Sequence, residues 1–203
     1  MFAPSFCMSA FGIDNDGNFV TGNSGGSPAI RSYVGLSNTL SGQSFTTGSN
    51  LNLGTLGFDE SGNIVAYHNG TTNNTKKYNL DYSGGVIDQE TMVNGSSIQY
   101  GGGKMSNGDY INMASTVVYR YNGFSGSQTD SFSLSANEVC GTDGSNIYTK
   151  EPNDTDNVKV WDGFTGNQLY TFTRPSTRCS GFAVYQGFLY IASLDTIYKM
   201  GNA

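Results

Sequence analysis

The chain has 203 residues, 13% of them charged and 13% aromatic, and its net charge is −6. Its length predicts one domain with room for a sizeable core. Lys and Arg form no cluster, which argues against a surface that neutralises the phosphates of nucleic acid or of an anionic membrane. No apolar run reaches the ~18 residues that a membrane span needs.

One short phrase recurs along the chain, with apolar residues on either side of a polar turn rich in Gly and Asn. Each copy predicts a strand, a tight turn and a second strand. The copies begin at Gly12, Gly57, Gly103, Gly141 and Gly181, at steps of 38 to 46 residues. A period of about 40–45 all-β residues indicates the blades of a β-propeller.

Each repeat also has a second half, in which a strand ends in a turn and a fourth strand follows. The fourth strands are expected at 43–47, 86–92, 129–134 and 168–173. One four-stranded blade cannot bury both of its faces alone. Neighbouring blades are therefore expected to stack face to face around an axis.

The last repeat is one strand short. Its strands are expected at 181–185, 188–192 and 196–200, and the sequence stops at Ala203. Residues 1–8 precede the first repeat, so we expect them to supply the missing outer strand and to close the ring. Pro4 suits such an edge strand, where a missing N–H is tolerated.

The predicted fold is therefore all-β, a five-bladed β-propeller of four-stranded antiparallel blades, closed by the N-terminal strand. It forms a single domain over 1–203, with the closing strand at 1–8 and blades at about 9–47, 48–92, 93–134, 135–174 and 175–203, the last completed by the N-terminal strand.

The phrases at 11–19 and 56–64 resemble the blade phrase of NHL-type and related β-propellers. This resemblance covers nearly the whole chain as repeats and implies the architecture. It implies no particular activity, because propellers host many functions. The sequence departs from the WD40 pattern, since Trp161-Asp162 opens a turn in repeat four only.

The longer loops at 22–29, 68–75 and 150–157 are expected to converge on one face of the propeller. Their amides, hydroxyls and carboxylates suit a polar ligand such as a sugar, with Tyr67 and Tyr148 nearby. Loops of this composition also serve to keep a face hydrated. The candidate ligand-binding residues on this loop face are Asn69, Thr71, Asn73, Asn74, Asp154, Asp156 and Asn157.

Asp14, Asp59 and Asp143 each follow a repeat glycine by two residues, which places them at one rim near the axis. Paired carboxylates in such a place are what glycoside hydrolysis requires. An Asp that enters a turn also accepts hydrogen bonds from turn N–H groups. The other two repeats carry Met105 and Ala183 there, which favours the turn role.

No cofactor and no metal site are expected. His68 is the one histidine of the chain, which argues against a zinc site or a Ser-His-Asp triad. Residues 14–18 begin like a calcium loop, but Gly25 stands where an EF-hand needs Glu.

The composition, rich in Gly, Ser, Asn and Thr and poor in charge, resembles that of virion surface and tail-associated proteins. Residues 1–7 lack the features of a signal peptide. We therefore expect a virion-associated structural or adhesion protein, a rigid propeller on a virus or phage particle. The other locations considered are the cytoplasm and the extracellular space by a non-classical route.

The expected partners are other structural subunits of the particle and host-surface glycans or a receptor, with no nucleic acid and no membrane insertion. No catalytic set is recognised, so the chain is expected not to be an enzyme. The alternative function is a lectin-like carbohydrate-binding module, followed by a glycoside hydrolase.

Overall fold

The computed structural model describes residues 10–23, 28–35, 37, 39–48, 54–68, 75–79, 81–90, 99–135, 139–150, 157–173, 181–193 and 196–202. All the regular structure in these residues is β-strand, as the sequence predicts. Within these ranges no helix is long and apolar enough to cross a membrane.

The strands fall, in chain order, into five antiparallel units. Unit one holds β1 (Ala10–Ile13), β2 (Phe19–Gly22), β3 (Ala29–Tyr33) and β4 (Leu40–Thr46). After β5 (Gly54–Thr55), unit two holds β6 (Gly57–Phe58), β7 (Ile64–Tyr67), β8 (Thr75–Tyr78) and β9 (Val86–Glu90). Unit three holds β10 (Gln99–Lys104), β11 (Tyr110–Ala114), β12 (Val117–Tyr121) and β13 (Gln128–Ser133). Unit four holds β14 (Val139–Thr142), β15 (Ile147–Lys150), β16 (Asn157–Trp161) and β17 (Gln168–Thr173). Unit five holds β18 (Gly181–Tyr185), β19 (Phe188–Ser193) and β20 (Thr196–Asn202).

The hydrogen-bonded sheets do not coincide with these units, and this corrects the expectation of five separate four-stranded blades. The sheets have five, eight, three and four strands. β5 pairs in parallel with β1, and Gly101 of β10 pairs in parallel with Cys140 of β14. Neighbouring inner strands thus approach closely enough to share backbone hydrogen bonds, so units three and four form one sheet.

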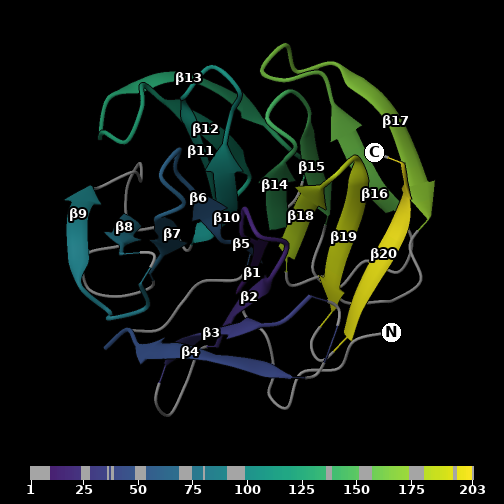
Figure 1. The fold of residues 1–203 in the computed structure, drawn as a ribbon. Coiled ribbons are helices and arrows are strands. Elements are labelled where there is room, and N and C mark those ends of the chain that lie inside the picture. Colours follow the sequence, from purple (N-terminus) through teal and green to yellow (C-terminus); the bar gives the residue numbers. More distant parts are fainter. Residues whose placement is uncertain are drawn as a thin grey trace.

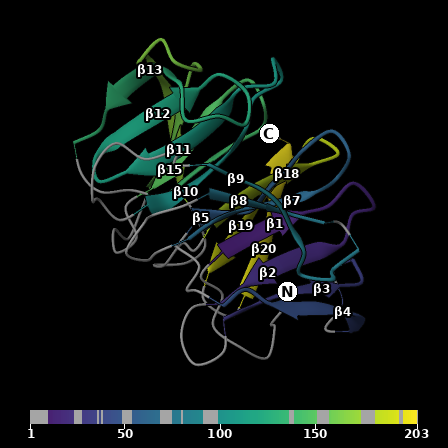
Figure 2. The same cartoon turned by 90° about the vertical axis from the view of Figure 1, so that its left-hand side faces the viewer.

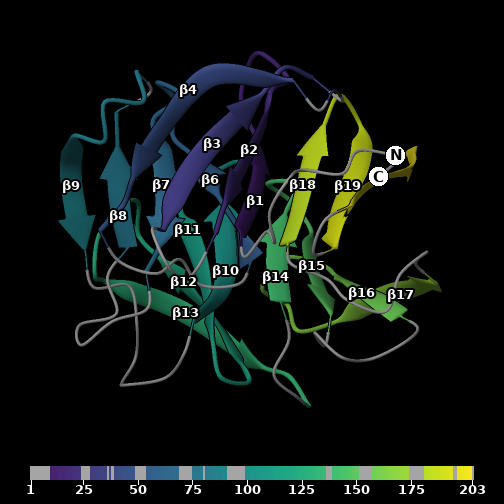
Figure 3. The same ribbon diagram turned by 90° about the horizontal axis from the view of Figure 1, so that it is seen from below.

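The first strands of the units lie near the middle of the molecule, and the last strands lie at its periphery (Figure 1). β1 and β18 lie side by side, and β18 also contacts β14 (Figures 1 and 3). Unit three lies across the molecule from β3 and β4 (Figures 1 and 2). The inner strands are therefore shielded, while the side chains of β9, β13 and β17 are mostly exposed.

Five apolar clusters fill the junctions between neighbouring units. One of them joins the last unit to the first, and in it the ring centroids of Phe19 and Tyr190 lie 5.5 Å apart. Burying a large apolar side chain such as Phe11, which is also in this cluster, stabilises the fold by about 1.5–3 kcal/mol. Each unit thus depends on its neighbours for its core.

Gly102 of β10 marks a close approach near the middle of the molecule. A Cβ atom on this residue would lie 2.0 Å from the Ile111 carbonyl oxygen and 2.5 Å from the Tyr67 hydroxyl oxygen. The Tyr67 hydroxyl is buried and donates a hydrogen bond to that same carbonyl at 2.7 Å. Only glycine leaves room for this contact between units two and three.

The predicted strand bounds agree closely with the structure in several repeats. β17 and β18 coincide with the expected 168–173 and 181–185. Unit five shows three strands in the described part of the chain, as the sequence predicts. Residues 1–8 lie outside the described residues, so closure by the N-terminal strand stays a prediction.

Candidate functional site

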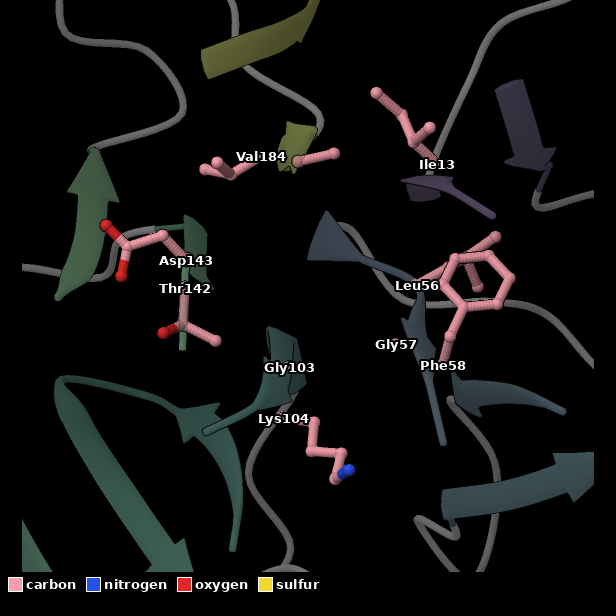
Figure 4. A pocket seen from close by; sticks show the side chains of 10 residues that line it. Ile13, Leu56, Gly57, Phe58, Gly103, Lys104, Thr142, Asp143 and Val184 are labelled. Carbon is pink, nitrogen blue, oxygen red and sulfur yellow. The ribbon is translucent and has the colours of Figure 1, made fainter. Parts of the chain in front are cut away.

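A pocket of about 200 Å³ lies where the inner strands of the five units end. Each unit contributes one residue at the end of its first strand or, in unit five, one residue before that end. We call these five residues the axial ring: Ile13, Phe58, Lys104, Thr142 and Val184. All five are half-buried, and they surround the pocket in Figure 4. The site is thus assembled from segments far apart in the sequence.

Glycines shape the wall of this pocket. Gly57 and Gly103 line it beside Phe58 and Lys104. A Cβ atom on Gly103 would lie 2.8 Å from the Thr142 Cγ2 atom. Glycine at this position therefore lets units three and four approach each other while the pocket stays open.

The turns next to the ring hold the three aspartates for which a catalytic role was considered. In each, Oδ1 accepts hydrogen bonds from two backbone N–H groups of the turn at 2.6 to 3.0 Å, and Oδ2 accepts one from an Asn side chain. The pairs of Asp and Asn are Asp14 with Asn18, Asp59 with Asn63, and Asp143 with Asn146. The turn role suggested by the sequence is therefore confirmed.

Asp143 is the one of these aspartates that lines the pocket. Besides its turn bonds, it accepts a hydrogen bond from the Tyr148 hydroxyl at 2.8 Å. Burial raises the pKa of Tyr148, and the bond to Asp143 raises it further, so the hydroxyl stays protonated as a donor. Four donors fill the lone-pair positions of a carboxylate. Asp143 is therefore a structural part of the wall.

Lys104 is the charged member of the axial ring. Its ammonium group forms an ion pair with Glu60, which lies on the first turn of unit two. The Glu60 side chain is 74% exposed and that of Lys104 is 20% exposed. The hydrogen bond from Lys104 lowers the pKa of Glu60. Because the Glu60 carboxylate is exposed to solvent, this ion pair contributes little to the stability of the fold.

Of the predicted loop-face residues, Asn157 falls in the described part of the chain. Asn157 is exposed at the start of β16, and it does not line the pocket. The other six, Asn69, Thr71, Asn73, Asn74, Asp154 and Asp156, lie outside the described residues. Binding at that face stays a prediction.

The axial ring is not among the site residues predicted from the sequence, although the sequence carries a signal for it. Ile13, Phe58, Lys104 and Thr142 each follow a repeat glycine directly. In unit five the ring residue is Val184, which follows Ala183 and not Gly181. Ala183, and not Gly181, is therefore the equivalent of the repeat glycines, so the repeat phase expected for that unit is wrong by two residues.

The described part of the chain holds no group of three or more His, Cys, Asp or Glu side chains placed to bind a metal ion. His68 is buried, and its Nε2 atom lies 2.8 Å from the Tyr78 hydroxyl. It belongs to the packing around β7 and β8 and not to the pocket.

Comparison with known proteins identifies the fold class of this chain through similar solved structures. No family model and no curated protein sequence matches the chain. A glutaminyl cyclase of Myxococcus xanthus is similar, with a TM-score of 0.74 and 13% identity over 98% of this chain and 92% of that one. A protein of unknown function from Bacteroides caccae has a TM-score of 0.62 and 13% identity, covering 93% of this chain and 71% of that one. The chain therefore has a propeller-like all-β fold.

This comparison corrects one expectation. The sequence was interpreted as that of a protein that is not an enzyme, because no catalytic set was recognised. A chain with the same fold over nearly its whole length is an enzyme. The interpretation was wrong because it considered only sequence motifs, and the lack of a recognised motif does not exclude an enzyme.

Proposed function

We propose that this chain is a binding protein in which a closed five-bladed propeller holds a small polar ligand in its axial pocket. Closure is supported by the apolar cluster between units five and one. It is also supported by the strand count, since unit five has three strands in the described residues. In this proposal residues 1–8 add the fourth strand along β20.

The axial ring is the observation that carries the binding role. Every unit contributes one side chain to it, and these side chains differ in chemistry: three are apolar, one is a hydroxyl and one is an ammonium. Small-molecule sites in proteins have this character, with mostly apolar walls and a few polar groups that fix orientation.

The size of the pocket limits the ligand. An apolar cavity of about 150 Å³ is large enough to bind benzene. A pocket of about 200 Å³ therefore admits a molecule of that size or the terminal group of a longer one. The terminal sugar of a glycan is within this limit, which suits the lectin-like alternative, with one central pocket instead of one in each blade.

The setting we propose for this binding is the surface of a virus or phage particle. The low charge and the content of Gly, Ser, Asn and Thr favour it. One end of the propeller would dock on other structural subunits, and the other would meet host glycans or a receptor. Mass spectrometry of purified particles against the cell pellet tests this, because a virion component is present in stoichiometric amount.

Catalysis at the same pocket is the second candidate, favoured by the likeness to a glutaminyl cyclase. The corresponding reaction would be cyclisation of an amino-terminal glutaminyl group with release of ammonia. An ammonia-release assay with a glutaminyl peptide tests it directly. Glycoside hydrolysis has less support, since the three turn aspartates are held by turn hydrogen bonds.

The binding role is tested by filling the pocket. Val184→Phe places a larger side chain in the axial ring, and Val86→Phe makes the same change on the exposed strand β9. We expect small sugars, acids or amides to shift the NMR signals of residues lining the pocket in the parent chain and in Val86→Phe. These shifts should disappear in Val184→Phe. Equal binding to both variants, or no binding at all, contradicts the proposal.

A further inference from the structure

The polar groups around the axial pocket differ in how firmly they are held. Asp143 already accepts hydrogen bonds from four donors. The Thr142 hydroxyl donates to the Asn146 carbonyl oxygen at 2.7 Å and accepts from the Gly144 N–H at 2.9 Å. Both side chains are therefore engaged in holding the turn of unit four.

Lys104 is held differently. Its ammonium group has three donors, and in the described structure Glu60 is the residue that forms an ion pair with it. Glu60 lies on an exposed turn of another unit and reaches Lys104 through water-accessible space. An ion pair with such a partner contributes little to stability, because water and salt screen it.

The Glu60 carboxylate thus forms an ion pair with the cation of the pocket, but this pair holds Glu60 only weakly. A carboxylate on a bound molecule would offer Lys104 the same charge and the same acceptors. It would in addition be held by contacts of the rest of the ligand with Phe58 and Ile13, which line the same pocket. An entering acid can therefore replace Glu60 at little cost.

We infer that the ligand of the axial pocket carries a carboxylate, and that it binds by displacing Glu60 from Lys104. This inference rests on the proposed binding function and specifies its ligand class. The ligand is a small acid whose body packs on the apolar members of the axial ring. An acidic sugar or another small carboxylate of that size meets this description.

The net charge of −6 does not oppose this inference. Charges farther than about 8 Å are largely screened at physiological ionic strength, so the local group decides. Once Glu60 moves away, Lys104 is the cation among the residues that line the pocket, and the one carboxylate among them, that of Asp143, is already engaged by four donors.

The test uses matched pairs of acids and neutral amides, namely glucuronate with glucuronamide and benzoate with benzamide. Binding is followed by NMR titration of the parent chain. The acid of at least one pair should bind more tightly than its amide, with shifts at residues of the axial ring. The pair that binds shows whether a hydroxylated or an apolar body is preferred.

Two variants then test the displacement. Glu60→Gln removes the competing carboxylate, so the affinity for the acid should rise about two- to fivefold and that for the amide should not change. Lys104→Met should lower the affinity for the acid roughly tenfold, since it removes a charged hydrogen bond.

Asp88→Asn is the matched control. It removes one negative charge from an exposed position on the outer strand β9. If it raises the affinity as much as Glu60→Gln does, the effect comes from net charge and the displacement is wrong. If amides bind the pocket as tightly as their acids, the inference fails while the binding function stands. If nothing binds, both fail.

Discussion

The ammonium group of Lys77 in unit two lies 4.6 Å from the centroid of the Phe124 ring in unit three. It is also 3.3 Å from the carboxylate of Asp59, on the first turn of its own unit. One cation therefore joins a turn near the axis to the neighbouring unit.

The next junction repeats this arrangement. The Arg120 guanidinium lies 5.6 Å from the centroid of the Phe164 ring in unit four, and its Nε atom is 3.0 Å from Asp109. Arg120 and Lys77 hold the same place in their strands, one residue before Tyr121 and Tyr78. The two junctions are thus held by the same combination of charge and ring.

The pair of Lys77 and Phe124 should be energetically coupled. In a double-mutant cycle with Lys77→Met and Phe124→Leu, we expect a coupling of about 0.5–1 kcal/mol in the free energy of urea unfolding. Lys76→Met serves as the control, because neighbouring residues of a strand point to opposite faces. A coupling as large for Lys76 would show that the contact with the ring is not responsible.

The Asp59 carboxylate should make stability depend on pH. Burial alone raises its pKa, but hydrogen bonds from Asn63 and Lys77 outweigh burial and leave the pKa below the ordinary 3.8. A carboxyl whose folded pKa is lowered contributes stability that is present above its unfolded pKa. That stability is lost as the pH falls through the folded pKa.

Asp59→Asn should therefore lower the free energy of unfolding at pH 7 and flatten its decline below about pH 4. Urea titrations between about pH 3 and pH 7 measure both effects. Asp16→Asn is the control, since Asp16 is exposed on the equivalent turn of unit one. Identical pH profiles for the two variants would contradict the role of the Asp59 contacts.

Gly102→Ala should be severely destabilising. The new Cβ atom would collide with a backbone carbonyl oxygen, which is not the end of a flexible side chain and cannot move aside cheaply. We expect a loss of more than about 3 kcal/mol or a failure to fold. Gly201→Ala is the matched control, because no atom lies within 4 Å of the place that its Cβ atom would take. Its thermal unfolding should match that of the parent chain.

Removal of residues 1–8 should expose the edge of β20 and sharply reduce stability if these residues form the closing strand. The measurement is the unfolding temperature of the truncated chain. A synthetic peptide of residues 1–8 added in excess should restore part of the loss. Unfolding at the temperature of the full chain would show that closure does not depend on this segment.

Much of the fold could be predicted from the sequence because its signals are local. The turn phrases fix the hairpins, and period-two patterns fix strands such as β12 and β17, whose bounds follow from them. The turn role of Asp59 could also be inferred, because an Asp at the entry to a turn has N–H donors within two to four residues.

The rest depends on contacts between units, which leave no local pattern. The pairing of Gly101 with Cys140 is a backbone contact between inner strands. The pocket is lined by at least one residue from each of the five units. The ion pair of Lys104 joins it to Glu60 of another unit, 44 residues away in the sequence. Repeats in the sequence indicate equivalent positions but not which of them converge.

The continuous sheet of units three and four should give the molecule a preferred order of opening. Among the described residues, β18 to β20 form a sheet of their own, in which no strand pairs with a strand of a neighbouring unit. Separation of units three and four also requires the rupture of backbone hydrogen bonds between β10 and β14. Amide hydrogens of these two strands should therefore exchange with solvent more slowly than those of unit five, and β10 to β17 should behave as one cooperative folding unit. The five units therefore repeat the same strand order but should differ in cooperativity.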